Sequence, residues 1–181
     1  MKKVLVIMVL VATAAVLCGC SEEVVEEEFD ESDLVAVDEY IEEMTEELLD
    51  IKPDLQGWIR EPYQEDLPLR YDEERIGWLK EQQERLAEIE NLYRQGDFPT
   101  EEEITSWEVV VVRGEKEWLL EGREVLGALD KLEQLKEKVS GAIEMIETSG
   151  GELNMEQSEE VMALIDELEP EVEEIRAVLF R

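Results

Sequence analysis

VVVVRGEKEWLLEGREVLGALDKLEQLKEKVSGAIEMI, residues 109–146, is the stretch on which the fold of this 181-residue chain depends. Four consecutive valines, taken alone, favour a β-strand. Apolar residues seven positions apart nevertheless begin just before this stretch and run through all of it, and this spacing is typical of helices that pack as in a coiled coil. They are Ile104, Val111, Trp118, Val125, Leu132, Val139 and Ile146. Because the spacing keeps its phase at Gly114 and Gly122, we predict one continuous helix of about 47 residues, roughly 70 Å long.

Three shorter helices are predicted on either side of this long one. Apolar residues at alternating steps of three and four mark the first, from Leu34 to Trp58, and a similar pattern marks the second, over residues 72–95. A proline-containing linker, residues 60–71, separates these two helices. The fourth helix follows Ser149-Gly150-Gly151 and extends to Leu179. We therefore predict an all-α fold with four helices.

Capping signals place the starts of the last two helices. Thr100 with Glu103 forms a capping box for the long helix, and Asn154 with Gln157 can cap the fourth. Because the long helix is twice the length of its neighbours, we expect an elongated antiparallel bundle, with a three-helix part followed by a long helical hairpin. The alternative is a compact four-helix bundle in which the long helix is broken at Gly114 or Gly122.

The charge of the chain excludes several classes of partner. It has 50 acidic and 17 basic residues, no histidine and a formal net charge of −33. Nucleic acids and anionic lipid surfaces carry the same sign of charge and are therefore poor partners. The regular spacing of the apolar residues argues against the disorder that such acidity would otherwise suggest.

The first twenty residues, MKKVLVIMVLVATAAVLCGC, read as a secretory leader. Two lysines precede an uncharged apolar run that is too short to cross a bilayer. Leu17-Cys18-Gly19-Cys20 at its end resembles the lipobox of bacterial lipoproteins, although a cysteine at the second position is unusual. Cys20 follows the small residue Gly19 and matches the cysteine that receives lipid. An uncleaved membrane anchor and an ordinary signal peptide are the alternatives.

This resemblance implies an organisation in three parts. Residues 1–19 would be a leader removed by cleavage, residues 20–32 an acidic tether with lipid (diacylglycerol and palmitate) on Cys20, and residues 33–181 the helical bundle domain. The leader contains two lysines and no acidic residue, so the charge of the remainder is −35. The implied location is the cell envelope. Ser21 after the cysteine favours the outer membrane in a diderm bacterium, and a monoderm would carry the protein on the outer face of its single membrane.

The residues offer little to catalysis or to a bound metal. The chain lacks histidine, a glycine-rich phosphate loop and a serine in a nucleophile elbow, and its two cysteines belong to the predicted lipobox. Zinc and di-iron sites normally use histidine, and no calcium loop of the D-x-D-x-D-G type occurs. We therefore expect no enzymatic activity, no cofactor and no metal.

Five aromatic residues form the strongest candidate site. They are Trp58, Tyr63, Tyr71, Trp78 and Trp118. Counting along antiparallel helices from the turn between the second and the long helix places Trp78 and Trp118 at the same height. The cluster is expected to be an aromatic plug that closes the core, or a docking surface for a partner, since aromatic residues dominate both kinds of site.

Two functions remain open at this point. The first is a lipid-anchored, non-catalytic interaction or spacer module that contacts the membrane through Cys20 and another envelope protein through its helices. The second is a binding lipoprotein that captures a cationic ligand, namely a metal ion, a polyamine or a basic peptide, because the chain is so acidic.

Overall fold

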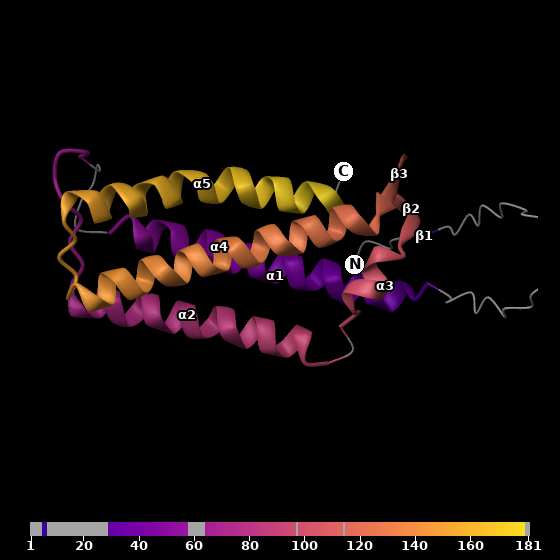
Figure 1. The fold of residues 1–181 in the computed structure, drawn as a ribbon, viewed down its shortest axis with the longest axis horizontal. Coiled ribbons are helices and arrows are strands. Elements are labelled where there is room, and N and C mark those ends of the chain that lie inside the picture. The colour runs from indigo at the N-terminus through magenta and orange to yellow at the C-terminus, as the bar shows by residue number, and fades with distance from the viewer. Residues whose placement is uncertain (1–4, 7–28, 58–63, 97, 114, 180–181) are drawn as a thin grey trace, which may run out of the picture.

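Four long helices lie side by side in an antiparallel bundle, with short strands at one end (Figure 1). The computed structural model describes residues 5–6, 29–57, 64–96, 98–113 and 115–179. The long helices are α1 (Glu31–Leu55), α2 (Glu73–Arg94), α4 (Gly122–Thr148) and α5 (Met155–Leu179). Helix α1 packs against α2 and α5, and α4 packs against the same two helices. The predicted helical bundle is confirmed in that the chain is mostly helical, but the strands mean that the fold is not all-α.

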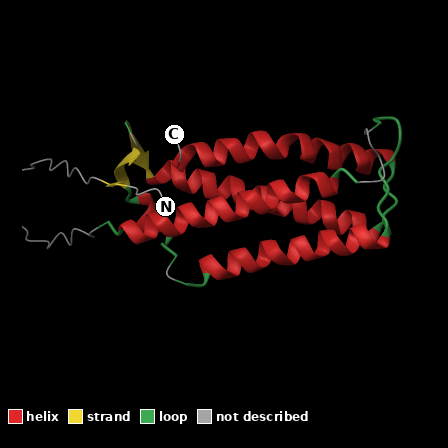
Figure 2. Cartoon of the chain, turned by 180° about the vertical axis from the view of Figure 1, so that it is seen from behind, coloured by secondary structure: helices red, strands yellow, loops and turns green. Residues whose placement is uncertain are grey.

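The predicted continuous helix over residues 101–148 is wrong. A short helix, α3 (Glu101–Thr105), is followed by the antiparallel strands β2 (Glu108–Arg113) and β3 (Lys116–Glu121), and α4 begins only at Gly122. The longest helix therefore has 27 residues, about 40 Å, and the predicted rod is not formed. The long helices are arranged as in the alternative four-helix bundle. The hairpin, which we did not predict, stands at one end of that bundle (Figure 2).

Gly122 is the point where the chain changes from strand to helix. Its N–H donates to the carbonyl oxygen of Trp107 at 2.9 Å, which continues the strand pairing by one more step. A Cβ atom built on Gly122 would lie 1.6 Å from the carbonyl oxygen of Ile104, far inside any real contact. The residue after β3 must therefore be glycine for α3 to lie across the first turn of α4.

A third strand completes the sheet on its other side. Strand β1 (Leu5–Val6) pairs antiparallel with β2, with Leu5 opposite Val112 and Val6 opposite Val111. The strand order is thus β1-β2-β3. Strand β1 belongs to the segment that we predict to be a cleaved leader.

The core lies between the four long helices and begins at α1. The apolar stripe that predicted the first helix is buried along its length, from Leu34 to Leu55. The buried residues of the described core lie between Leu34 and Leu179, and Phe29, at the end of the predicted tether, packs partly buried against them. Helix α1 itself starts at Glu31, two residues before the predicted boundary of the domain, with Asp30 as its N-cap.

Ion pairs connect neighbouring helices of the bundle. Basic residues of α2 and α4 contact acidic residues of α1 and α5. These pairs include Arg85–Glu43, Lys131–Glu174 and Lys138–Glu167, with N–O distances of 2.8, 2.5 and 3.1 Å. Exposed pairs of this kind contribute little singly. Together they place basic side chains against acidic ones on neighbouring helices, which reduces the repulsion expected in so acidic a chain.

The end of the bundle away from the strands is closed by the linker between α1 and α2. The N–H of Tyr71 donates to the carbonyl oxygen of Gly151 at 2.9 Å, and the N–H of Leu69 donates to Oγ of Ser158 at 3.0 Å. Gly151 has a φ of +82°, and a Cβ there would lie 2.1 Å from the carbonyl oxygen of Tyr71. We call this arrangement, residues 69–71 against residues 151–153 and Ser158, the distal clasp.

Candidate functional site

The structure does not bring the five predicted aromatic residues together. Trp58 and Tyr63 lie outside the described residues. Tyr71 and Trp78 lie at the distal end of the bundle, whereas Trp118 lies on β3 at the hairpin end. The prediction that Trp78 and Trp118 are level is wrong, because residue 118 precedes α4 and is not part of a long helix.

Tyr71 has the character of the predicted plug. It is buried, and its hydroxyl donates to the carbonyl oxygen of Leu55 at the end of α1. Burial raises the pKa of the Tyr71 phenol far above its usual range, so the hydroxyl stays protonated. Tyr71 therefore joins the end of α1 to the distal clasp.

Trp78 has the character of the predicted docking residue. It is 48% exposed on the first turns of α2, and its Nε1 donates to Oδ2 of Asp54 at 2.5 Å. The same carboxylate is paired with the guanidinium of Arg75, which is buried. The indole ring is thus held by one hydrogen bond at its edge and remains half open to solvent.

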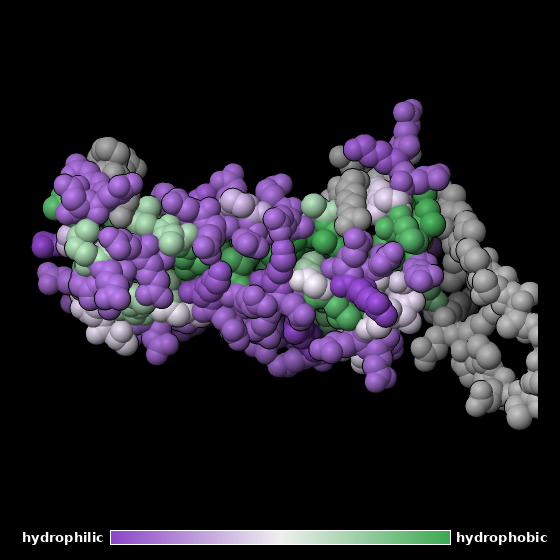
Figure 3. Space-filling view, turned by 45° about the horizontal axis from the view of Figure 1, so that its top comes forward, coloured by the Kyte–Doolittle hydropathy of each residue, from purple (hydrophilic) through white to green (hydrophobic). Residues whose placement is uncertain are grey.

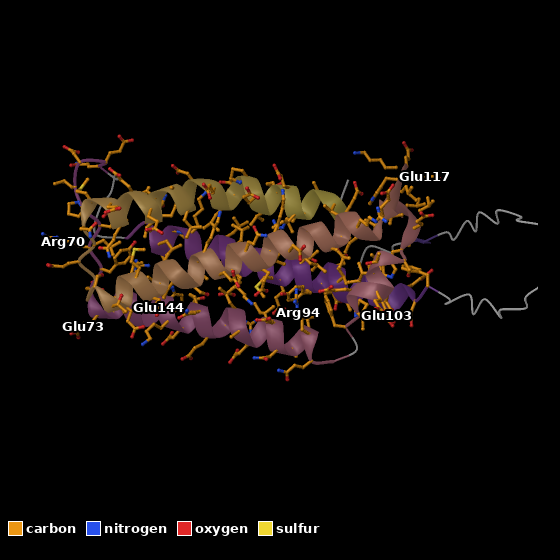
Figure 4. All side chains as sticks on the ribbon, viewed as in Figure 1. Arg70, Glu73, Arg94, Glu103, Glu117 and Glu144 are labelled. Carbon is orange, nitrogen blue, oxygen red and sulfur yellow. The ribbon has the colours of Figure 1, made fainter. Side chains whose placement is uncertain are left out.

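An acidic groove of about 560 Å³ surrounds Trp78. We call it the distal groove, and it is lined by Asp54, Glu73, Glu74, Arg75, Gly77, Trp78 and Glu81. Figure 4 shows Arg70 and Glu73 at this end of the bundle, far from Glu117 of the hairpin. An aromatic face beside carboxylates is a combination that attracts organic cations.

A second group of aromatic residues, near the hairpin end, was not recognised in the sequence. The ring of Tyr40 lies 5.9 Å from that of Tyr93 and 5.4 Å from that of Phe98, and the guanidinium of Arg94 lies 5.3 Å from the Tyr40 ring. Tyr40 precedes Ile41 in the predicted stripe of the first helix, so the pattern did not single it out. The buried Tyr40 places this group in the core.

The hydroxyl of Tyr93 extends from this group to a carboxylate. It donates to Oε2 of Glu43 at 2.8 Å, and this hydrogen bond raises the pKa of Tyr93 to about 12. Glu43 also accepts from Arg85 at 2.8 Å. These hydrogen bonds join α1 to α2, and we assign them a role in stabilising the bundle and none in binding a ligand.

A small apolar cavity of about 70 Å³ lies at the hairpin end. Its apolar lining comes from α1, both strands and the end of α5, namely Leu34, Val35, Val111, Leu120 and Leu179, and Glu31 and Asp38 complete it. Val35 is half exposed beside it. Hydrophobic side chains reach the surface at this end of the molecule (Figure 3).

Within the described ranges, no three histidine, cysteine, aspartate or glutamate side chains form a group that could hold a metal ion. No helix in the same part of the chain is long and apolar enough to cross a membrane. Cys20, the predicted lipidation site, lies outside the described residues.

Comparisons with protein-family models, with curated proteins and with solved structures gave no match to this chain. The candidate sites are therefore the two ends of the bundle as geometry and charge present them: an acidic groove with an exposed indole at one end, and an apolar cavity beside a small sheet at the other.

Proposed function

We propose that this protein is a lipid-anchored lipoprotein of the cell envelope that acts as a non-catalytic helical spacer and interaction module. The lipobox-like LCGC supports the anchor. The observation that carries the proposal is the position of α1, whose first residue, Glu31, lies at the hairpin end of the bundle. Lipid on Cys20 would then hold that end near the membrane and leave the distal end free.

The length of the tether sets how far the bundle can stand from the membrane. Ten residues separate Cys20 from Glu31, and an extended chain of that length spans at most about 35 Å. The helices add about 40 Å beyond this. The negative charge of the chain opposes contact with anionic lipid and favours a bundle that stands off the surface.

The interaction partner in this proposal is another protein of the envelope. In a diderm bacterium the anchor would be in the outer membrane, and in a monoderm on the outer face of the cytoplasmic membrane. A bundle whose neighbouring helices are joined by ion pairs supports a role in holding a partner at a fixed distance from the lipid.

Metabolic labelling with a fatty-acid probe tests the anchor. The wild-type protein and a Cys18→Ser variant should both become labelled, because Cys18 leaves with the leader. Cys20→Ala should stay unlabelled and keep its leader, which the intact mass of the protein would show. Label on Cys20→Ala, or a wild-type protein released free into the medium, would contradict the anchor.

A second function, capture of a cationic ligand, is favoured by the distal groove. The half-exposed Trp78 lies beside four carboxylates, those of Asp54, Glu73, Glu74 and Glu81. A polyamine can place methylenes and one ammonium on the indole face while its other ammonium groups contact carboxylates.

Thermal melts with spermidine at fixed ionic strength test this second function. A binder gains stability that keeps rising once the ligand concentration exceeds its dissociation constant. Trp78→Ala should lose the gain, and Leu92→Ala, which truncates an exposed residue at the other end of α2, should keep it. An equal effect of spermidine on both variants would show a general screening of charge.

A further inference from the structure

We propose that the outer edge of β2 in the mature protein binds an extended apolar strand of a partner protein, by adding that strand to the sheet. The inference rests on the proposed function, because cleavage before Cys20 would remove the strand that covers this edge. That strand is β1, whose residues Leu5 and Val6 lie opposite Val112 and Val111. A segment of the chain's own leader thus shows what the edge can accept.

The hydrogen-bonding direction of β2 identifies the groups that a new strand would use. Gly122 donates to the carbonyl oxygen of Trp107, so positions 107, 109, 111 and 113 direct their backbone groups toward β3. The alternation of an antiparallel ladder then directs the N–H and C=O groups of Val110 and Val112 outward. Among the described residues, no strand other than β1 pairs with these groups, so its removal would open them to another strand.

Proteins usually protect an edge of this kind with lysine, proline or a bulge. The central residues of β2, Val109 to Val112, are four valines paired in regular register with β3. Such a strand favours pairing with another extended chain, in the mode by which several domains bind peptides through main-chain hydrogen bonds. The edge is therefore suited to strand addition.

The adjoining apolar cavity gives this edge a preference for a partner strand that carries an aliphatic side chain. Val111 belongs to β2 and also lines the cavity of about 70 Å³, together with Leu120, Leu34 and Leu179. This volume is roughly half that of an engineered cavity that binds benzene, so it can hold one aliphatic side chain. A partner strand with an aliphatic residue beside Val111 would fill it.

The charges around the site decide between possible occupants. Glu31 and Asp38 line the cavity, and Glu108 and Glu121 are exposed at one end of the hairpin. A partner strand with acidic residues would be repelled, as would a second copy of a chain with a charge of −35. The occupant that fits is an uncharged aliphatic strand with neutral or basic flanks.

A labelled peptide of the leader, KKVLVIMVL (residues 2–10), is the probe for this site. It is titrated into residues 21–181 and followed by fluorescence anisotropy. This piece of the chain contains all the buried core residues among those that the structure describes, and we expect it to fold without the leader. Saturable binding is expected, and a peptide with Leu5→Pro, which removes the donor opposite Val112, should bind at least tenfold more weakly. Absence of saturable binding of the wild-type peptide would overturn the proposal.

Two proline variants of the protein locate the binding edge. Val112→Pro removes an outward N–H of β2 without removing a bond to β3, and should weaken binding at least tenfold. Leu119→Pro is the matched control, because Leu119 lies opposite Val110 and directs its N–H to the far edge of β3. It should bind the peptide as the wild type does. Equal affinity of the wild type and Val112→Pro would place the peptide elsewhere.

Hydrogen exchange of the wild-type chain gives the same test without any substitution, in case a proline variant fails to fold. Peptide addition should slow exchange at Val110 and Val112 and leave Leu119 unchanged; protection confined to other residues would overturn the proposal. So would a dimer of residues 21–181 in sedimentation that Val112→Pro dissociates, because a second copy would then occupy the edge. None of these measurements needs lipid, so failed labelling at Cys20 would reject the anchor separately.

Discussion

Replacement of Gly122 by alanine tests the transition from strand to helix directly. A Cβ at this position would lie 1.6 Å from the carbonyl oxygen and 2.7 Å from the carbonyl carbon of Ile104. Both neighbours are backbone atoms, so relief requires α3 to move away from α4. Overpacking of this kind typically costs about 1–3 kcal/mol, and contact with backbone, which cannot move aside as a flexible side chain can, points to the upper end of that range.

The same substitution elsewhere in α4 should act in the opposite direction. Gly127 and Gly141 are exposed within the helix, and a Cβ on either would meet nothing within 4 Å. Alanine at each should stabilise the protein by about 0.5–1 kcal/mol, because glycine is the poorer helix former. The three variants therefore differ in sign within one helix.

Urea unfolding followed by circular dichroism at 222 nm measures all three. Gly122→Ala should lower the free energy of unfolding by about 3 kcal/mol, which corresponds to roughly 6–12 °C in Tm for a domain of this size. If residues 101–148 formed one continuous helix, Gly122 would be an ordinary interior glycine. Its replacement by alanine would then stabilise the protein as at Gly127, and that result would refute both the hairpin and the close crossing of α3.

Three further predictions concern exposure, a buried hydroxyl and pH. Trp78→Ala should change the free energy of unfolding by less than about 1 kcal/mol, whereas Trp107→Ala, at a site only 5% exposed, should cost about 3–5 kcal/mol. Acrylamide should quench the emission of Trp78 more strongly than that of Trp107. Tyr71→Phe removes the donor to the carbonyl oxygen of Leu55 and should cost about 1–2 kcal/mol in urea unfolding; an unchanged midpoint would contradict this bond. Burial raises the pKa of Glu47 in the folded protein, so its charged form is disfavoured on folding. Glu47→Gln should therefore raise the urea midpoint at pH 7, and this gain should disappear as the pH falls below 4.5, the ordinary value, where the carboxyl is protonated in both states.

The sequence predicted the helices well where one stripe faces one core. The stripe from Leu34 to Leu55 is buried as expected. The capping box of Thr100 and Glu103 is formed, with both hydrogen bonds present, and so is the reciprocal pair of Asn154 and Gln157. These are local interactions within a few residues, and the residue types alone specify them.

The spacing of seven predicts a continuous helix wrongly, for a geometric reason. In the hairpin, Val111 and Trp118 lie directly opposite each other and are seven residues apart. Cross-strand partners share a face of the sheet, so a hairpin with this register can reproduce one interval of a heptad. Val125, seven residues further, is already in α4 and buried. The phase therefore continued from sheet to helix although the secondary structure changed twice.

The candidate sites were harder to predict because they depend on which helix ends and strands lie next to each other in the folded bundle. Trp118 was placed level with Trp78 because residues 101–148 were predicted to form one helix. Since Trp118 lies on β3, that placement is wrong. Trp78 itself lies off the buried stripe of α2, next to Leu79, so its exposure could have been read from the sequence. The cavity beside Val111 is lined in part by Leu34, near the start of the helical domain, and by Leu179, near its end. Residues so far apart in the chain cannot be brought together by any local sequence pattern.

The distal clasp also determines the order in which the molecule can fold. Leu69 and Ser158 are 89 residues apart in the chain, and Tyr71 reaches Gly151 over a similar separation. Contacts this distant form only after the intervening loop has been closed, at an entropic cost. Helices α1 and α2 can associate early, but the backbone N–H groups of Leu69 and Tyr71 cannot bond to Ser158 and Gly151 until the turn between α4 and α5 exists. We therefore expect closure of this end to be the last step, and variants at Gly151 to slow the final phase of refolding more than the initial formation of helix.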